Sequence, residues 1–146
     1  MLIEKFKSGG NNLGVYGIML EYVIYERRRV MIRRSEDINE RRVLNARGGD
    51  KEAVFYDWMT PDEAKGHGRL FSKLVLEPGA SIGYHEHSGE FEAFYMISGE
   101  ATLNDNGVTE VIKAGDMAIC RDGEGHSIKN NGSQDAVLIA MIMNTL

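Results

Sequence analysis

Two histidines and a glutamate lie close together in the stretch His85–Glu92, which reads HEHSGEFE. His85 and His87 are two residues apart, so on a β-strand their side chains project from the same face. If the Ser-Gly pair that follows connects two strands in a hairpin, Glu92 reaches the space in front of both imidazoles. Imidazole nitrogens and carboxylate oxygens bind divalent metal ions at about 2.0–2.2 Å. The stretch can therefore be part of a metal site. It can equally be a solvated strand face, because two further glutamates are interspersed.

Strands must position these side chains, and the sequence after residue 68 has the pattern of a β-protein. Short apolar or β-branched runs alternate with clusters rich in glycine, asparagine, aspartate and serine. This spacing is typical of an all-β sandwich or barrel rather than of βαβ units. The eight predicted strands are Arg69–Leu76, Ser81–His87, Phe91–Ile97, Ala101–Asn104, Val108–Ile112, Met117–Cys120, His126–Lys129 and Ala136–Met143.

Two segments of the chain resemble the signature motifs of the cupin superfamily. The segment from Gly79 to Gly99 fits the pattern G-x5-H-x-H-x4-E-x6-G. The segment from Gly115 to Asn130 fits G-x5-P-x-G-x2-H-x3-N in every named position except one. Arg121 stands where the family usually has proline, so this turn lacks the φ angle that proline would preset. The resemblance covers about half of the chain.

The resemblance implies a cupin-type double-stranded β-helix, which is a jelly-roll barrel whose two sheets enclose a cavity. It also implies one divalent metal ion, which would be manganese, iron, zinc or nickel. The metal ligands implied by the motifs are His85, His87 and Glu92 in the first motif and His126 in the second. Positive φ angles are expected at the turn glycines Gly79, Gly99, Gly115 and Gly123.

The expected domain organisation is a single cupin barrel over residues 31–146, with its motif core at 69–144. Residues 1–30 are interpreted either as an N-terminal arm or as an extension ahead of a native start at Met31. The second interpretation arises because Glu-Arg-Arg, just before Met31, can be encoded by a purine run that recruits bacterial ribosomes.

Between Met31 and the motifs, three local signals are present. Ala53–Trp58 is predicted to be a strand. Thr60–Glu63 is a capping box with proline at the first helical position, which predicts one or two helical turns. The charged segment Ser35–Arg42 is expected to form a short helix or a loop.

Composition and charge exclude several classes of function. The chain has 146 residues, a net charge of −5 and a pI near 5.4, whereas a nucleic-acid-binding protein shows a basic face. The apolar run Leu13–Tyr25 is interrupted by Glu21 and is shorter than the roughly 20 residues of a membrane span. The only cysteine, Cys120, is compatible with a reducing cytosol. We therefore expect a cytoplasmic protein that binds neither nucleic acid nor membrane.

Some side chains outside the motif positions also carry chemistry. His67, between two glycines, is expected at the surface, and Cys120 is expected to be a buried, inert thiol. Three cations are either anchors for an anionic substrate or solvated side chains: Arg69, Lys73 and Arg121. The sequence offers two candidate acids behind the metal ligands, Glu90 and Glu100.

The expected function is metal-dependent catalysis on a small polar metabolite, such as an organic acid, a sugar or a carbonyl compound. Three imidazoles and one carboxylate leave about two positions free on a six-coordinate metal, and open positions suit Lewis-acid or O2 chemistry. In the superfamily such sites serve oxygenases, decarboxylases, isomerases and lyases. The alternative is a module that binds or senses a sugar or organic acid in the barrel cavity. The two hypotheses differ in the cavity, because an enzyme needs a general acid or base there.

A homodimer is also expected, because related barrels commonly pair their exposed sheet faces. The apolar stretch Ala53–Trp58 and the run Leu13–Tyr25 are the candidate contacts.

Overall fold

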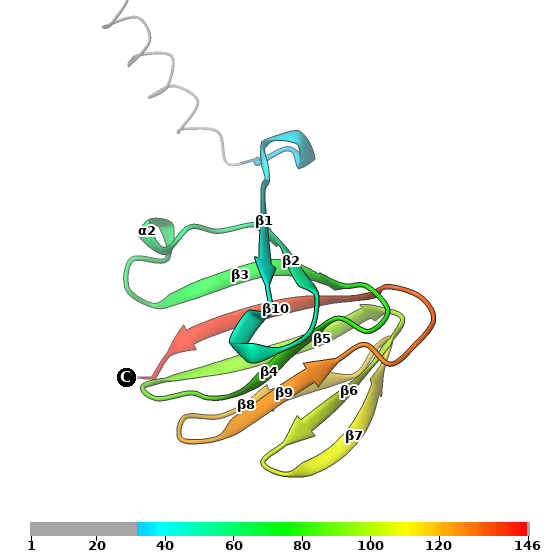
Figure 1. Cartoon of the computed structure of the whole chain (residues 1–146). Coiled ribbons are helices and arrows are strands. Elements are labelled where there is room, and N and C mark those ends of the chain that lie inside the picture. The colour runs from blue at the N-terminus through cyan, green and yellow to red at the C-terminus, as the bar shows by residue number, and fades with distance from the viewer. Residues whose placement is uncertain (1–31, 146) are drawn as a thin grey trace, which may run out of the picture. The chain divides into compact units, whose positions relative to one another are not determined.

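The computed structural model describes residues 32–145, so the segment 1–30 and its apolar run lie outside the described residues. From Ser35 onward the described chain is an all-β unit in two antiparallel sheets, as predicted (Figure 1). The six-stranded sheet contains, in spatial order, β1 (Asn39–Leu44), β2 (Glu52–Asp57), β3 (Gly68–Leu76), β10 (Ala136–Asn144), β5 (Glu90–Ser98) and β8 (Met117–Cys120). The four-stranded sheet contains β4 (Ser81–Glu86), β9 (Gly125–Lys129), β6 (Glu100–Asp105) and β7 (Val108–Lys113).

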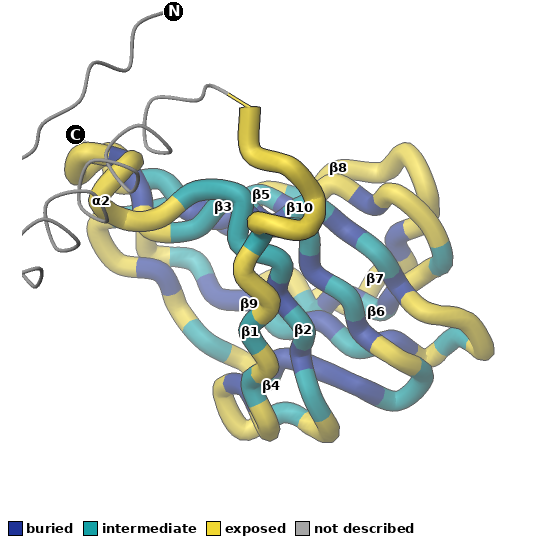
Figure 2. Tube along the Cα trace, turned by 90° about the horizontal axis from the view of Figure 1, so that it is seen from above, coloured by how far each residue is buried: buried dark blue, intermediate teal, exposed yellow. Residues whose placement is uncertain are grey.

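The core lies between the two sheets and receives alternate residues of their strands. In β5, Glu92, Phe94 and Met96 are buried, whereas Tyr95 between them is exposed. Figure 2 shows this alternation of buried and less buried positions along the strands. The largest fully buried apolar side chains come from both sheets: Leu74, Leu76, Phe94, Met96, Ile128 and Leu138. Because successive side chains of a strand point to opposite faces, every second residue points inward. These inward residues include both the core side chains and the candidate ligands.

The strands predicted after residue 68 correspond to β3–β10, and the predicted strand Ala53–Trp58 corresponds to β2. The capping box is present at α2 (Pro61–Ala64), where the Thr60 hydroxyl accepts from the Glu63 N–H at 3.3 Å. The segment expected as helix or loop at 35–42 begins with the 3-10 turn η1 (Ser35–Asp37) and continues into β1. The strand was missed because β1 is a charged edge strand that pairs only with β2.

The four turn glycines of the motifs have positive φ, as expected, with values of 85° at Gly79, 77° at Gly99, 94° at Gly115 and 79° at Gly123. At Gly99 the space is limiting as well, because an added Cβ would lie 2.4 Å from the carbonyl oxygen of Asp135. These positions need glycine for conformational reasons, and at Gly99 for steric ones too.

The turn that lacks the motif proline is closed by a side chain instead. The Arg121 N–H donates to the Glu124 carboxylate at 2.8 Å, and the Glu124 N–H donates to the Arg121 carbonyl at 3.0 Å. Asn130 fixes the next turn, because its side-chain amide donates to the carbonyl oxygens of Leu76 and Gln134. Hydrogen bonds therefore hold the turns before and after β9, the strand that carries His126.

Within residues 32–145, no helix has the length and hydropathy that crossing a membrane requires.

Candidate metal centre

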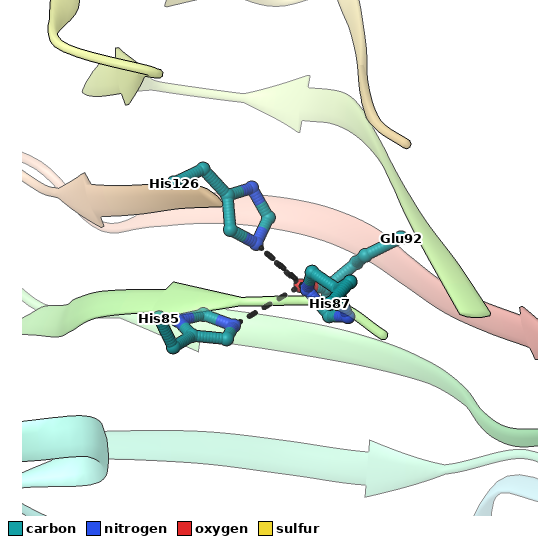
Figure 3. Close-up of side chains that lie close together, drawn as sticks. All are labelled: His85, His87, Glu92 and His126. Carbon is teal, nitrogen blue, oxygen red and sulfur yellow. Dashed lines mark hydrogen bonds and ion pairs between the residues drawn. The ribbon is translucent and has the colours of Figure 1, made fainter. Parts of the chain in front are cut away.

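The four residues implied by the motifs meet between the sheets (Figure 3). Each offers one ligand atom, and these atoms all lie within 4.8 Å of one another. The Glu92 Oε2 atom is 2.8 Å from His126 Nε2, 3.3 Å from His87 Nε2 and 3.7 Å from His85 Nε2. The Nε2 atoms of His87 and His126 are 3.2 Å apart. The structure thus brings together all four side chains that the sequence singled out.

The route by which Glu92 reaches the histidines differs from the hairpin considered from the sequence. β4 does not pair with β5: it pairs with β9, in a register that places His85 opposite His126. β5 belongs to the other sheet, so Glu92 faces the imidazoles across the interior of the unit. His87 lies just past the end of β4 and is held by backbone hydrogen bonds to Gly123 and Glu124. The two motifs therefore meet directly at the site.

Two imidazoles are oriented by hydrogen bonds on the ring side away from Glu92. The Nδ1 atom of His85 lies 2.9 Å from the carbonyl oxygen of Gly83, and that of His87 lies 2.9 Å from Oε1 of Glu90. When Nδ1 carries the proton in a neutral ring, Nε2 presents its lone pair to the centre. The Phe94 ring stacks on His126 with centroids 5.2 Å apart and an interplanar angle of 11°. Hydrogen bonds and stacking thus fix the orientations of the three rings.

This donor set fits a divalent metal ion. Donors that each lie about 2.0–2.2 Å from one ion are separated by roughly 3–3.5 Å when their angles are 90–109°. The three Glu92–histidine distances, 2.8, 3.3 and 3.7 Å, lie within or close to this range. Three imidazoles with one carboxylate suit manganese, iron, zinc or nickel rather than calcium or magnesium.

The electrostatic environment keeps Glu92 ionised. Burial raises the pKa of this carboxyl, but the hydrogen bonds from His126, His85 and His87 outweigh burial and hold the pKa well below its usual range. The pKa of His87 is raised above its ordinary value, chiefly by its contact with Glu92 and also by Glu90. The protein therefore presents an anionic centre among imidazoles, which a cation would neutralise.

Glu90 supports the site from behind, and of the two candidate acids it is the one that contacts a ligand. Its carboxylate accepts from His87 and from the Arg69 guanidinium, which holds the pKa of Glu90 below its usual value. Glu100 is an exposed residue of β6 and has no such contact with the four ligands. Residues that hold a metal-binding histidine in this way fix its tautomer and raise its basicity.

Replacing Glu90 with glutamine is expected to weaken metal binding by about 10–100-fold. The amide is uncharged, so it stabilises the orientation of His87 less than the carboxylate does. The dissociation constant can be measured by competition with a chromophoric chelator, with Glu100→Gln as the matched control. Equal affinities of the two variants would show that Glu90 does not support the site.

A cavity of about 250 Å³ opens beside the cluster and is lined by His85 and Glu92. Its other polar side chains are those of three arginines, Arg41, Arg47 and Arg69. Apolar side chains complete the lining: Val43, Ala46, Phe55, Leu70, Ile82 and Ile142. The cavity thus combines two of the four candidate metal ligands with three guanidinium groups, two of which are paired with carboxylates.

Arg69 was a candidate anchor in the sequence, whereas Arg41 and Arg47 were not recognised. They lie more than 30 residues before the first motif, and local spacing gives no sign that they return to it. The other two candidate cations do not line this cavity: the Lys73 Nζ atom lies 3.8 Å from the centre of the Tyr56 ring, and the Arg121 side chain is exposed. His67 is exposed outside the cluster, as expected.

A second cavity, of about 420 Å³, is lined by His126, Cys120 and residues of β6, β7 and β8. It contacts one of the four candidate ligands, whereas the smaller cavity contacts two. Cys120 is buried, as expected, and burial raises the pKa of its thiol to about 11, which disfavours the reactive thiolate form.

Comparison with known proteins agrees with the family that the motifs indicate. Residues 72–142 match the family model described as the cupin domain. The chain is also 40% identical over 113 residues to a Thermotoga maritima protein named oxalate-binding protein, covering 77% of this chain and 93% of that protein. The chain belongs to the cupin superfamily.

Solved structures show the same cupin architecture. A crystal structure of a predicted oxalate decarboxylase from Thermotoga maritima is 39% identical and covers 79% of this chain and 100% of that chain, with a TM-score of 0.75. A cupin 2 conserved barrel domain protein from Salinispora arenicola is 23% identical and covers 80% of this chain and 90% of that chain, with a TM-score of 0.62. The second similarity concerns the fold alone.

Proposed function

We propose that this cupin binds a small dicarboxylate, of which oxalate is the simplest, at one divalent metal ion held by His85, His87, Glu92 and His126. The observation that carries the proposal is the cavity that joins two of these ligands to three arginines. Guanidinium groups recognise carboxylates through paired N–H donors. Two printed names from Thermotoga maritima, oxalate-binding protein for a sequence relative and predicted oxalate decarboxylase for a crystal structure, support oxalate as the ligand.

The bound cation would supply a Lewis acid that attracts carboxylate oxygens. The chain supplies positioned positive charge around it. Arg41 is held in place by two hydrogen bonds to Asp57, at 2.9 and 3.0 Å, and Asp57 also accepts from the buried hydroxyl of Ser72 at 2.7 Å. The Arg41 guanidinium lies 4.3 Å from the centre of the Phe55 ring. Such groups need little rearrangement when an anion enters, which favours binding.

Apart from the candidate metal ligand His85, the polar side chains at the cavity hold charge rather than exchange protons. Arginine stays protonated at any pH that the fold tolerates. The pKa of Glu92 is held low, so this carboxylate stays ionised at neutral pH. This lining supports the binding hypothesis over general acid–base catalysis. Metal-dependent decarboxylation is the second candidate, because a relative 39% identical in sequence is described as a predicted oxalate decarboxylase.

The two candidates are separated by titrating oxalate into the full-length protein loaded with Mn²⁺ and assaying the same sample for formate. We expect saturable oxalate binding that disappears after chelation of the metal, without formate release. Repeated turnover to formate would favour the decarboxylase. A metal-loaded protein that binds no oxalate would contradict both.

We also propose that the protein is a homodimer. The outward face of β5 and β8 exposes four large apolar side chains: Tyr95, Ile97, Met117 and Ile119. Tyr95 lies opposite Met117 in the strand register, so these side chains form one surface. The stretch Ala53–Trp58, which the sequence suggested as a dimer contact, is less suitable. Its residues Ala53 and Phe55 are part of the core, so only the outward residues of β2 are available for a contact. A second copy that covers the apolar face would remove it from water.

Sedimentation equilibrium at tens of micromolar is expected to give the mass of a dimer. The double substitution Tyr95→Lys and Met117→Lys should give a monomer, since it places charge in the proposed contact. Val111→Lys, at an exposed apolar position of β7 in the other sheet, is the matched control and should remain dimeric. A wild-type monomer at high micromolar concentration would rule out the dimer.

A further inference from the structure

Arg47 differs from the other two arginines at the cavity in having no charged partner. Arg41 is paired with Asp57, and Arg69 is paired with Glu90. Among residues 32–145, no hydrogen bond or ion pair engages the exposed Arg47 side chain. Its guanidinium is therefore the one at the cavity whose donors are all available to a ligand.

The backbone of Arg47 is in an unusual conformation. It lies in the 3-10 turn η2 (Ala46–Gly48) with φ 54° and ψ 29°, in the left-handed region. Residues with a Cβ atom rarely adopt this conformation, and such outliers persist only where the surroundings hold them.

The surroundings that hold Arg47 belong to the strand that carries His85. The η2 loop lies so close to β4 that a Cβ atom on Gly83 would be 2.2 Å from the Arg47 carbonyl oxygen. A Cβ atom on Gly49 would be 2.3 Å from the carbonyl oxygen of Ser81. The Asp50 N–H donates to the Ser81 hydroxyl at 2.7 Å, and the Ser81 N–H donates to the Asp50 carbonyl at 2.9 Å. Arg47 is thus anchored by its backbone two strand positions from the candidate ligand His85.

We propose that Arg47 binds the carboxylate oxygens that point away from the metal and so makes the site select dicarboxylates over monocarboxylates. The inference rests on the proposed function. A monocarboxylate can be held at the metal end by the same contacts, but it offers no second carboxylate to the guanidinium. A dicarboxylate satisfies both ends and gains the charge-assisted hydrogen bonds of a free arginine.

The test measures the dissociation constants of oxalate and acetate in full-length, Mn²⁺-loaded wild type, Arg47→Gln and Arg47→Gly, together with Mn²⁺ affinity. Both variants should bind oxalate about 10-fold or more weakly, with acetate and Mn²⁺ affinities unchanged. Arg47→Gly should also melt at a higher temperature than wild type, because glycine adopts the left-handed conformation without strain. That variant remains informative if Arg47→Gln fails to fold.

Arg42→Gln is the matched control, because this substitution on β1 also removes one positive charge. In the wild type, Arg42 pairs with Glu40 and Glu52 and does not line the cavity. The variant should bind oxalate as wild type does. If wild type binds oxalate and the Arg47 variants bind it equally well, the role of Arg47 is refuted while the proposed function stands. If the Arg47 variants lose Mn²⁺ as well, Arg47 is not a specificity residue. If wild type binds no oxalate, the proposed function fails and the inference with it.

Discussion

Replacing His126 with alanine is expected to weaken divalent-metal binding by more than about 100-fold, the upper end of the range for residues that only support a ligand. His126 Nε2 is the imidazole nitrogen closest to Glu92 Oε2, at 2.8 Å, and the residue is 2% exposed. Its loss removes one of the four proposed ligands and leaves the buried carboxylate with fewer donors. The dissociation constant of Mn²⁺ or Zn²⁺ is measured by competition with a chromophoric chelator.

The control is His67→Ala, which removes an exposed histidine outside the cluster and should leave metal affinity unchanged. Because alanine at 126 also leaves a void beside Phe94, His126→Gln serves as a second variant that keeps most of the volume. Circular dichroism establishes that each variant is folded. If the His67 and His126 variants hold metal equally well, these residues do not form a metal site.

Metal loading is expected to raise the melting temperature strongly near pH 8 and hardly at all near pH 5. The four proposed ligands come from β4, its following loop, β5 and β9, so the donor set exists only in the folded chain. At free metal about 100 times the dissociation constant, the stabilisation is about 2.7 kcal/mol. For a domain of this size that corresponds to roughly 10 °C, measurable by differential scanning calorimetry with and without chelator.

The pH dependence follows from the protonation states that binding requires. The imidazoles must be neutral, and the raised pKa of His87 places its proton uptake above the ordinary value of 6.5. In the metal-free protein the raised pKa of His87 has the opposite effect on stability. It stabilises the folded state below about pH 6.5, and this contribution is lost as the pH rises through the folded-state pKa. The difference between the loaded and metal-free proteins should therefore grow from acid to alkaline pH. A difference that does not vary with pH would contradict ligation by histidine.

Local periodicity was enough to predict most of the strands and the turn glycines. Successive side chains alternate between the two faces of a strand, and particular turns require a positive φ. Both features can therefore be predicted from the types of residues that are close together in the sequence. The edge strand β1 was the exception. Its charged residues gave no alternation of apolar side chains, because the strand has a partner on one side only.

The candidate site divides in the same way. The spacing in HEHSGEFE indicated three candidate ligand residues, and the second motif added His126. The sequence did not show that β4 pairs with β9 while Glu92 approaches from the opposite sheet. A strand carries the same alternation whichever neighbour it pairs with, so the choice of sheet belongs to the packing of the whole barrel.

The sequence by itself therefore determined the family, the all-β class and the four candidate ligands. Only the tertiary structure placed Arg41 and Arg47 at the cavity and Glu90 behind His87. The two arginines are separated from His85 by about 40 residues, and the contact depends on how β2 and β3 return the chain to β4. Contacts of this kind are made by segments distant along the chain, so short-range spacing carries no record of them.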